Sequence, residues 1–237
     1  MNKGAPVQVQ WLGRVAYDEA WNRQRELVAA GSNGRHQDQL LLLEHPAIYT
    51  LGRGGREENL LYDEATLRRE GIAVQRVDRG GDITYHGPGQ LVGYPILDLK
   101  RLYAARGYSR PDLHLYLREI EEVLIAVLRR FGILGWRYEG YTGVWVNGTE
   151  GPLKIAAIGV KVSSKGISSH GFALNVDPDL EHFQGIIPCG IREHGVTSMA
   201  QMLKQSLTVD ELLTPVSEAF SRVFGVPTWF VALSHSS

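Results

Sequence analysis

The chain has 237 residues, of which 43% are hydrophobic and 22% charged, a composition typical of a globular protein that buries a full core. The formal net charge of −1 excludes a global attraction to nucleic acid or to an anionic membrane, so we expect neither as a partner. The single cysteine cannot form an internal disulfide, and no signal-peptide or membrane-spanning pattern is found, which predicts a cytoplasmic protein.

The first predicted elements are a helix and a buried strand. An amphipathic pattern predicts a helix from Tyr17 to Ala30, which Gly31 and Gly34 are expected to end. Four consecutive leucines then predict a buried strand from Gln39 to Glu44.

The next segment predicts a short helix between strands. Asp63 is expected to cap a helix that ends near Gly71, followed by a strand from Ala73 to Asp78. Another strand is predicted from Leu91 to Leu97. Because Pro95 cannot donate to a sheet ladder, we expect it at an edge or a bulge.

The longest helix is predicted from Asp112 to Phe131, with Gly132 ending it. One apolar face is expected to comprise Leu113, Leu117, Ile120, Leu124, Val127 and Phe131. Three strands should follow, at Val144 to Val146, Lys154 to Val162 and His170 to Val176. Asn147-Gly148 is the expected turn between the first two.

A capping box of Thr208 and Glu211 predicts a last helix that reaches about Val223. Helices and strands mix without strict alternation, so the predicted fold class is α+β, with a mixed sheet flanked by helices. We expect one catalytic domain over residues 1–237, with a few flexible residues at each end.

The only cysteine, Cys189, is the first candidate for chemistry. A lone cysteine is by default a small buried hydrophobe. Here it lies between Pro188 and Gly190 in a turn-forming segment, where a thiol can be exposed and fixed. Because a free thiol has a pKa near ~8.5, a neighbouring cation or base is needed to raise its thiolate fraction.

Lys154 and Lys161 can supply that help. They lie an odd number of residues apart (161 − 154 = 7), so strand alternation predicts that they face opposite sides of the sheet. Either lysine can also be a solvated edge residue, and spacing alone does not choose between them.

Three further residues in glycine-rich contexts are candidates for binding. Arg79 precedes Gly80-Gly81, where the backbone can approach a ligand closely, and His86 is surrounded by polar neighbours. His170 is equally well explained as a structural histidine. Neither histidine has the spacing of a metal site.

Small residues cluster in two adjacent predicted strands, and would leave a slot if those strands pair: Ala156, Ala157, Gly159, Gly171 and Ala173. The slot is either close packing beneath a helix or a narrow tunnel for an acyl chain. Burial of about six methylenes at ~0.8 kcal/mol each would contribute about 5 kcal/mol of binding.

Five ordered blocks within Glu44 to Ser198 resemble the lipoyl(octanoyl) transferase family, which belongs with the lipoate-protein ligases B. The blocks are Glu44-His45-Pro46-x-x-Tyr49-Thr50-x-Gly52-Arg53, Arg79-Gly80-Gly81-x-x-Thr84-Tyr85-His86-x-x-Gly89-Gln90-x-Val92-x-Tyr94, Lys154 to Val160, His170 to Asn175 and Pro188 to Ile191. The resemblance implies the α+β catalytic fold shared by biotin- and lipoate-protein ligases.

The resemblance also implies roles for individual residues. Cys189 matches the acyl-thioester nucleophile, and Lys154, not Lys161, matches the lysine that lowers the pKa of the cysteine and acts as base. The implied substrate-binding residues are Arg79, Gly80, Gly81, Asp82, Ile83, Thr84, Tyr85, His86, Ala157, Ile158, Gly159, Gly171, Phe172 and Ala173. Arg79 and His86 are expected near the mouth of the acyl site. The resemblance gives no role to Arg192-Glu193-His194.

The implied reaction transfers an octanoyl group from octanoyl-acyl carrier protein to a lysine of lipoyl domains. The implied acceptors are the lipoyl domains of 2-oxoacid dehydrogenases and the glycine cleavage H protein. No metal, nucleotide or other cofactor is expected. The alternatives are an ATP-dependent lipoate or octanoate ligase and a non-catalytic module that binds acylated proteins.

Overall fold

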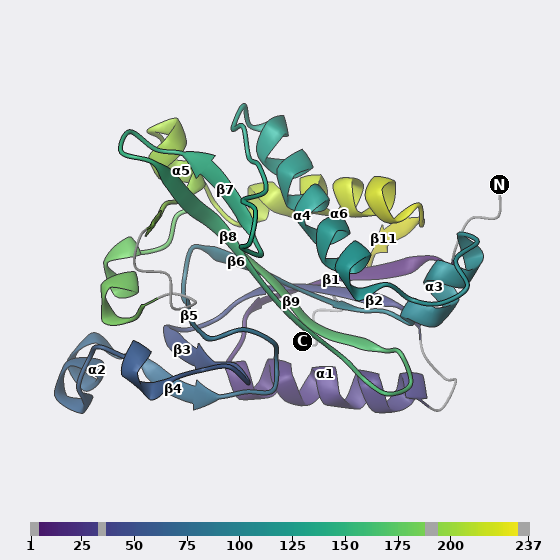
Figure 1. Cartoon of the computed structure of the whole chain (residues 1–237), viewed down its shortest axis with the longest axis horizontal. Coiled ribbons are helices and arrows are strands. Elements are labelled where there is room, and N and C mark those ends of the chain that lie inside the picture. The colour runs from purple at the N-terminus through teal and green to yellow at the C-terminus, as the bar shows by residue number, and fades with distance from the viewer. Residues whose placement is uncertain (1–4, 33–36, 188–193, 232–237) are drawn as a thin grey trace, which may run out of the picture.

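The computed structural model describes residues 5–32, 37–187 and 194–231, and within them a large mixed sheet is the centre of the fold (Figure 1). The sheet has eight strands in the order β10-β8-β9-β6-β2-β1-β11, with β7 beside β8. The strands are β1 (Val7–Arg14), β2 (Gln39–Glu44), β6 (Gln90–Ile96), β7 (Val144–Asn147), β8 (Pro152–Val162), β9 (Ser168–Asn175), β10 (Gly195–Val196) and β11 (Thr228–Phe230).

A second sheet lies below the large one in Figure 1, with the order β4-β3-β5. Its strands are β3 (Ile48–Leu51), β4 (Ala73–Arg76) and β5 (Ile83–His86). β5 runs directly into β6 of the large sheet, so the two sheets meet at residues 86–90. The glycine-rich segment 79–86 therefore lies at the junction of the two sheets.

Helices cover both faces of the large sheet. Figure 1 shows α4 (Leu113–Arg130) and α6 (Asp210–Phe224) above it and α1 (Tyr17–Ser32) below it. The main apolar core lies between the sheet and the pair α4 and α6, and a smaller core lies against α1. The shorter helices are α2 (Glu64–Glu70), α3 (Leu99–Ala105) and α5 (Met199–Leu203), with the 3₁₀ helices η1 (Glu57–Asn59) and η2 (Leu180–Gly185).

Side-chain caps explain where several helices begin and end. The Asp112 carboxylate accepts hydrogen bonds from the first backbone N–H groups of α4, and Asp63 does the same for α2. Gly71 and Gly225 end α2 and α6 in the left-handed conformation, at φ 65° and 66°. The predicted bounds of α2 and α4 are confirmed to within a residue or two.

The prediction that Pro95 lies at an edge or a bulge is wrong. Its strand, β6, is central rather than at an edge, because it pairs with both β2 and β9. The ladder to β9, however, ends at the pair Gly93 and Phe172. Continuing that antiparallel register places Pro95 opposite His170 (93 + 172 = 95 + 170), so the missing N–H falls in a gap of the ladder. His170 has φ 56° there, and its own N–H bonds the Gln24 side chain instead.

Two other sequence expectations differ from the structure. Asn147 pairs with Pro152 inside the hairpin, so the turn is the four-residue segment 148–151 and not Asn147-Gly148. α1 continues through Gly31 to Ser32, because a glycine lowers helix stability without ending a packed helix. Among the described residues, no helix is long and apolar enough to cross a membrane.

Candidate active site

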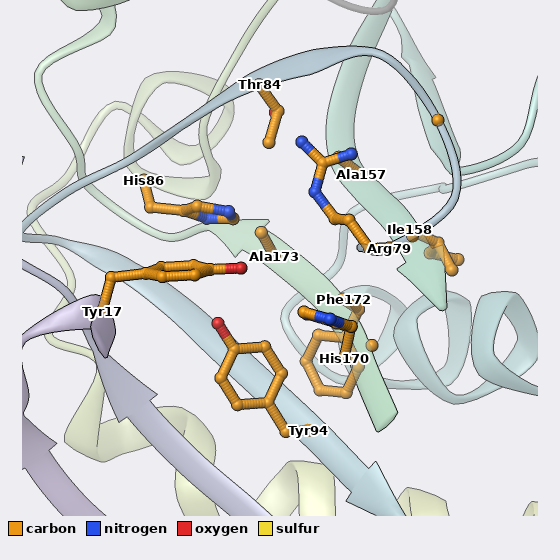
Figure 2. A pocket seen from close by; sticks show the side chains of 13 residues that line it. Tyr17, Arg79, Thr84, His86, Tyr94, Ala157, Ile158, His170, Phe172 and Ala173 are labelled. Carbon is orange, nitrogen blue, oxygen red and sulfur yellow. The ribbon is translucent and has the colours of Figure 1, made fainter. Parts of the chain in front are cut away.

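A narrow cavity of about 40 Å³ lies between the glycine-rich segment, α1 and the strands β6, β8 and β9 (Figure 2). Its lining comprises Tyr17, Arg79, Gly81, Thr84, His86, Tyr94, Ala157, Ile158, Gly159, His170, Gly171, Phe172 and Ala173. We call it the acyl pocket. Ten of the predicted substrate-binding residues line it, although they come from three separate segments of the chain.

Strand alternation divides the segment 79–86. Thr84 and His86 face the acyl pocket, whereas Ile83 and Tyr85 point the other way into an apolar cluster with Tyr49 and Phe183. The side chains of Ile83 and Tyr85 therefore do not line the acyl pocket, and their implied part in substrate binding stays a prediction. Gly80 and Asp82 line a neighbouring cavity, and Asp82 also accepts hydrogen bonds from the backbone N–H groups of Arg56 and Ile83.

Arg79 is buried, with 7% of its surface exposed, and so does not lie at an open mouth as expected. Its guanidinium donates to the carbonyl and the hydroxyl oxygen of Thr50, at 2.7 and 2.9 Å. His86 is equally buried. Arg79 thus holds the glycine-rich segment against β3 while its side chain forms part of the pocket wall (Figure 2).

The slot predicted from small residues is present. Ala157 lies opposite Ala173, and Gly159 lies opposite Gly171, on the paired strands β8 and β9. All four line the acyl pocket. Ala156 does not, because it belongs to the main core. At Gly159 a Cβ atom would approach the Gly80 carbonyl oxygen to 3.0 Å, so glycine allows the glycine-rich segment to close over the strand.

Tyr17, Tyr94 and His45 form a hydrogen-bonded chain along one wall, and Figure 2 shows the two tyrosine hydroxyls pointing toward each other. His45 Nδ1 lies 2.7 Å from the Val15 carbonyl oxygen, so Nδ1 must carry the proton. Nε2 then accepts from the Tyr94 hydroxyl at 2.8 Å. Burial lowers the pKa of His45 to about 4 and raises that of Tyr17 to about 12, so this wall is polar but uncharged at neutral pH.

His86 is fixed in the same way. The Gln90 side-chain nitrogen donates to the Tyr85 carbonyl and to Asn175, which leaves Gln90 Oε1 to accept from His86 Nδ1 at 2.8 Å. Burial lowers the pKa of His86 well below its ordinary value. A neutral imidazole with its Nε2 lone pair toward the pocket is the result.

Lys154 lies in the adjoining cavity of about 380 Å³, which shares Gly81, Ile158 and Gly159 with the acyl pocket. Its side chain is buried and its Nζ atom lies 5.4 Å from the centre of the Trp145 ring. Leu113, predicted to face the core, instead lines this cavity and is 47% exposed. The cavity thus combines a buried lysine with an apolar, accessible rim.

Alternation does not separate the two lysines as predicted. The register between β7 and β8 shifts between the pairs Val144–Ala156 and Trp145–Lys154, which breaks the period of two along β8. Their surroundings separate them instead, because Lys161 forms an ion pair with Asp78 beside a third cavity. Hydrogen bonds from Lys161 and His170 outweigh burial, which alone would raise the pKa of Asp78, and lower that pKa to about 2.

Cys189 lies outside the described residues, as do Arg192 and Glu193. The described residues on either side lie near the site. The Ile187 N–H donates to the Asn59 carbonyl oxygen at 2.8 Å, and the Asn59 side chain bonds Asp82. The His194 ring contacts Tyr138, Tyr141 and Trp145, with centroid distances of 5.1–5.9 Å. Val196 pairs with Lys154.

Tyr17, Tyr94 and His45 are residues along the pocket wall that the sequence did not reveal. Tyr94 and His45 lie within motif blocks, which was the available signal. Tyr17 precedes them by many residues at the start of a helix, and only the packing of α1 under the sheet brings it to the pocket. Within residues 5–32, 37–187 and 194–231, no group of three or more His, Cys, Asp or Glu side chains could hold a metal ion.

Residues 16–221 match the family model described as the lipoyl protein ligase A/B catalytic domain. An octanoyltransferase of Rubrobacter xylanophilus is 50% identical over 216 residues, which cover 91% of this chain and 92% of the relative. An octanoyltransferase of Chloroflexus aurantiacus is 45% identical over 228 residues, covering 96% and 98%.

Solved structures share the fold at much lower identity. The bipartite lipoate protein ligase of Thermoplasma acidophilum superposes with a TM-score of 0.68 at 18% identity, covering 98% of this chain and 89% of that one. A biotin protein ligase of Aquifex aeolicus has a TM-score of 0.52 at 14% identity, covering 92% and 70%. The predicted α+β ligase-type fold is confirmed.

Proposed function

Since the chain belongs to the lipoyl protein ligase A/B catalytic family and, within it, to the octanoyltransferases, we propose that it forms an octanoyl thioester on Cys189. The donor is octanoyl-acyl carrier protein, and the acceptor is a lysine of a lipoyl domain. The observation that carries this proposal is the pairing of a narrow pocket lined by small residues with an adjoining cavity that contains a buried lysine.

The acyl pocket suits the alkyl chain. Two alanines and two glycines leave the slot open, and the buried histidines and tyrosines around it are neutral. The charge that the wall does carry, on the Arg79 guanidinium, is bonded to Thr50. About six methylenes at ~0.8 kcal/mol each contribute about 5 kcal/mol, enough to retain an acyl group delivered on a carrier.

The adjoining cavity suits the two nucleophiles that must reach the acyl carbon, which are the Cys189 thiol and the amine of the acceptor lysine. Its exposed rim at Leu113 gives access from solvent, and Lys154 lies on the side toward Trp145. Of the described residues that flank the Cys189 segment, Ile187 bonds Asn59, whose side chain bonds Asp82. On the other side, His194 contacts Trp145.

The first half-reaction exchanges one thioester for another. Lys154 takes the proton of the Cys189 thiol, and the thiolate attacks the octanoyl carbonyl. A C–S bond to Cys189 forms, the C–S bond to the carrier's pantetheine breaks, and the leaving thiolate takes the proton back from Lys154.

The second half-reaction makes the amide. An acceptor lysine with a pKa near ~10.4 must lose a proton to attack, and Lys154 accepts it. The C–N bond forms and the C–S bond breaks. The Cys189 thiolate takes the second proton of the attacking nitrogen, and Lys154 releases the first proton to solvent. The acceptors are the lipoyl domains of 2-oxoacid dehydrogenases and the glycine cleavage H protein, and the kinetics are ping-pong.

Intact-mass spectrometry after mixing with octanoyl-acyl carrier protein tests the proposal. An octanoyl adduct on the wild-type chain, absent in Cys189→Ser, is expected. Lys154→Ala should slow both half-reactions strongly, and the matched control Lys161→Ala should have a mild effect. Equal effects of the two lysine substitutions would refute the role of Lys154 as the base. Turnover that requires ATP and free octanoate would favour a ligase, and no adduct at all would favour a binding module.

A further inference from the structure

His170 lies where the acyl pocket ends along the paired strands β8 and β9. From Lys154 toward the end of β8, the pocket is lined first by Ala157 and then by Gly159. The next residue of β8, Val160, pairs with His170, whose ring lines the pocket. Figure 2 shows this ring on the opposite side of the pocket from Thr84.

The length of this stretch fits a medium acyl chain. Three residues of strand separate Ala157 from Val160, which spans about 10 Å. An extended eight-carbon chain has seven C–C steps and spans about 9 Å, given a bond length of about 1.5 Å. A chain of ten or more carbons would have to pass the imidazole.

A further cavity of about 190 Å³ lies behind the imidazole. It is lined by Trp21, Val28, Asp78 and Lys161 among others. His170 Nε2 lies 2.8 Å from Asp78 Oδ1, and the His170 ring centre lies 6.4 Å from that of Trp21. The ring and its carboxylate partner therefore form the wall between the two cavities.

The backbone of His170 is held in an unusual conformation. Its φ of 56° is one that side-chain-bearing residues rarely adopt, and it persists because neighbours fix the residue from two sides. The N–H bonds Gln24 Oε1 at 2.7 Å, and the ring bonds Asp78. Such a conformation at a pocket wall is a feature associated with functional sites.

We propose that His170 is the specificity-determining residue that closes the acyl pocket and limits the acyl chain to about eight carbons. The inference rests on the proposed function. A longer chain is rejected because the imidazole, which lines the pocket and is bonded to Asp78, fills the path.

The test is the chain-length profile of His170→Gly. Glycine adopts positive φ without strain, so the backbone is preserved while the ring is removed. The assay measures kcat/KM with acyl carrier protein loaded with chains of 8, 10, 12 and 14 carbons. We expect the ratio of twelve- to eight-carbon activity to rise by roughly ten-fold or more, the gain when about two of the four additional methylenes are buried.

Lys204→Gly is the matched control, because Lys204 has φ 55° at the end of α5 and does not line the pocket. Its profile should equal that of the wild type. An unchanged profile in folded His170→Gly, or an equal rise in Lys204→Gly, would overturn the inference. If His170→Gly does not fold, His170→Asn, which also tolerates positive φ, should give a smaller shift in the same direction, and no shift there would overturn it as well.

Binding supplies a readout that does not depend on turnover. Dodecanoic acid should raise the melting temperature of His170→Gly more than that of the wild type, and an equal rise would count against the inference. Absence of octanoyl transfer by the wild-type chain would refute the proposed function. Wild-type transfer with an unaltered His170→Gly profile would refute this inference alone.

Discussion

Ala157→Leu tests whether the slot between β8 and β9 holds the acyl chain. Ala157 and Ala173 are direct partners on the two strands and both line the pocket. Side chains of such a pair lie about 5 Å apart, so three added carbons would occupy the slot at this level. These atoms and the acyl chain would compete for the same narrow slot.

The magnitude follows from the burial that is lost. If the added side chain displaces about three of six methylenes, the loss at ~0.8 kcal/mol each is about 2.4 kcal/mol, or roughly 60-fold in kcat/KM for octanoyl transfer. An acetyl group carries no chain into the slot, so its transfer should change at most about two-fold.

The assay measures kcat/KM with octanoyl- and acetyl-loaded acyl carrier protein, for Ala157→Leu and for a matched control variant. Ala104→Leu is the control, since it makes the same alanine-to-leucine change at a position that is exposed on α3. Melting temperatures verify that both variants fold. An equal fractional loss with octanoyl and acetyl donors would refute the reasoning, because the substitution would then act outside the slot.

Three further outcomes concern stability. The folded pKa of His45 is about 4, so the unfolded chain binds more protons between pH 6.5 and 4. The free energy of unfolding therefore falls by about 3 kcal/mol as pH falls through that window. In urea unfolding, the free energy of unfolding of His45→Phe should depend correspondingly less on pH. Asp78 has a lowered pKa, so its contribution is present above pH 4 and lost toward pH 2. The carboxylate is 38% exposed, so Asp78→Asn should cost only about 1 kcal/mol at pH 7 and nothing at pH 2. Gly171→Ala should cost about 3 kcal/mol, because its Cβ would lie 2.1 Å from the Gly93 carbonyl oxygen, whereas Gly54→Ala, with its nearest contact at 3.4 Å, should be mild.

Local chemistry was predictable from the sequence. Asp112 and Asp63 cap helices because a carboxylate satisfies N–H groups one turn ahead, which needs no knowledge of the rest of the fold. The small residues of β8 and β9 also revealed the slot, since pairing of neighbouring strands places them side by side.

Features that depend on distant partners were not predictable. The faces of Lys154 and Lys161 depend on a register shift against β7, and the depth of Arg79 depends on its bonds to Thr50. Tyr17 meets Tyr94 only because α1 packs beneath the large sheet. Each of these contacts joins segments whose separation in sequence carries no local signal.

Pro95 gives the acyl pocket a property that loop-built sites lack. The proline removes one rung from the middle of the large sheet, and the opposing residue, His170, turns out of the ladder and bonds a helix instead. The end of the pocket is therefore part of the scaffold itself. Insertions and deletions, which proteins accept easily in surface loops, cannot lengthen or shorten it without disturbing the central strands. Substrate range in this architecture should consequently drift slowly, by point substitution at the interrupted rung.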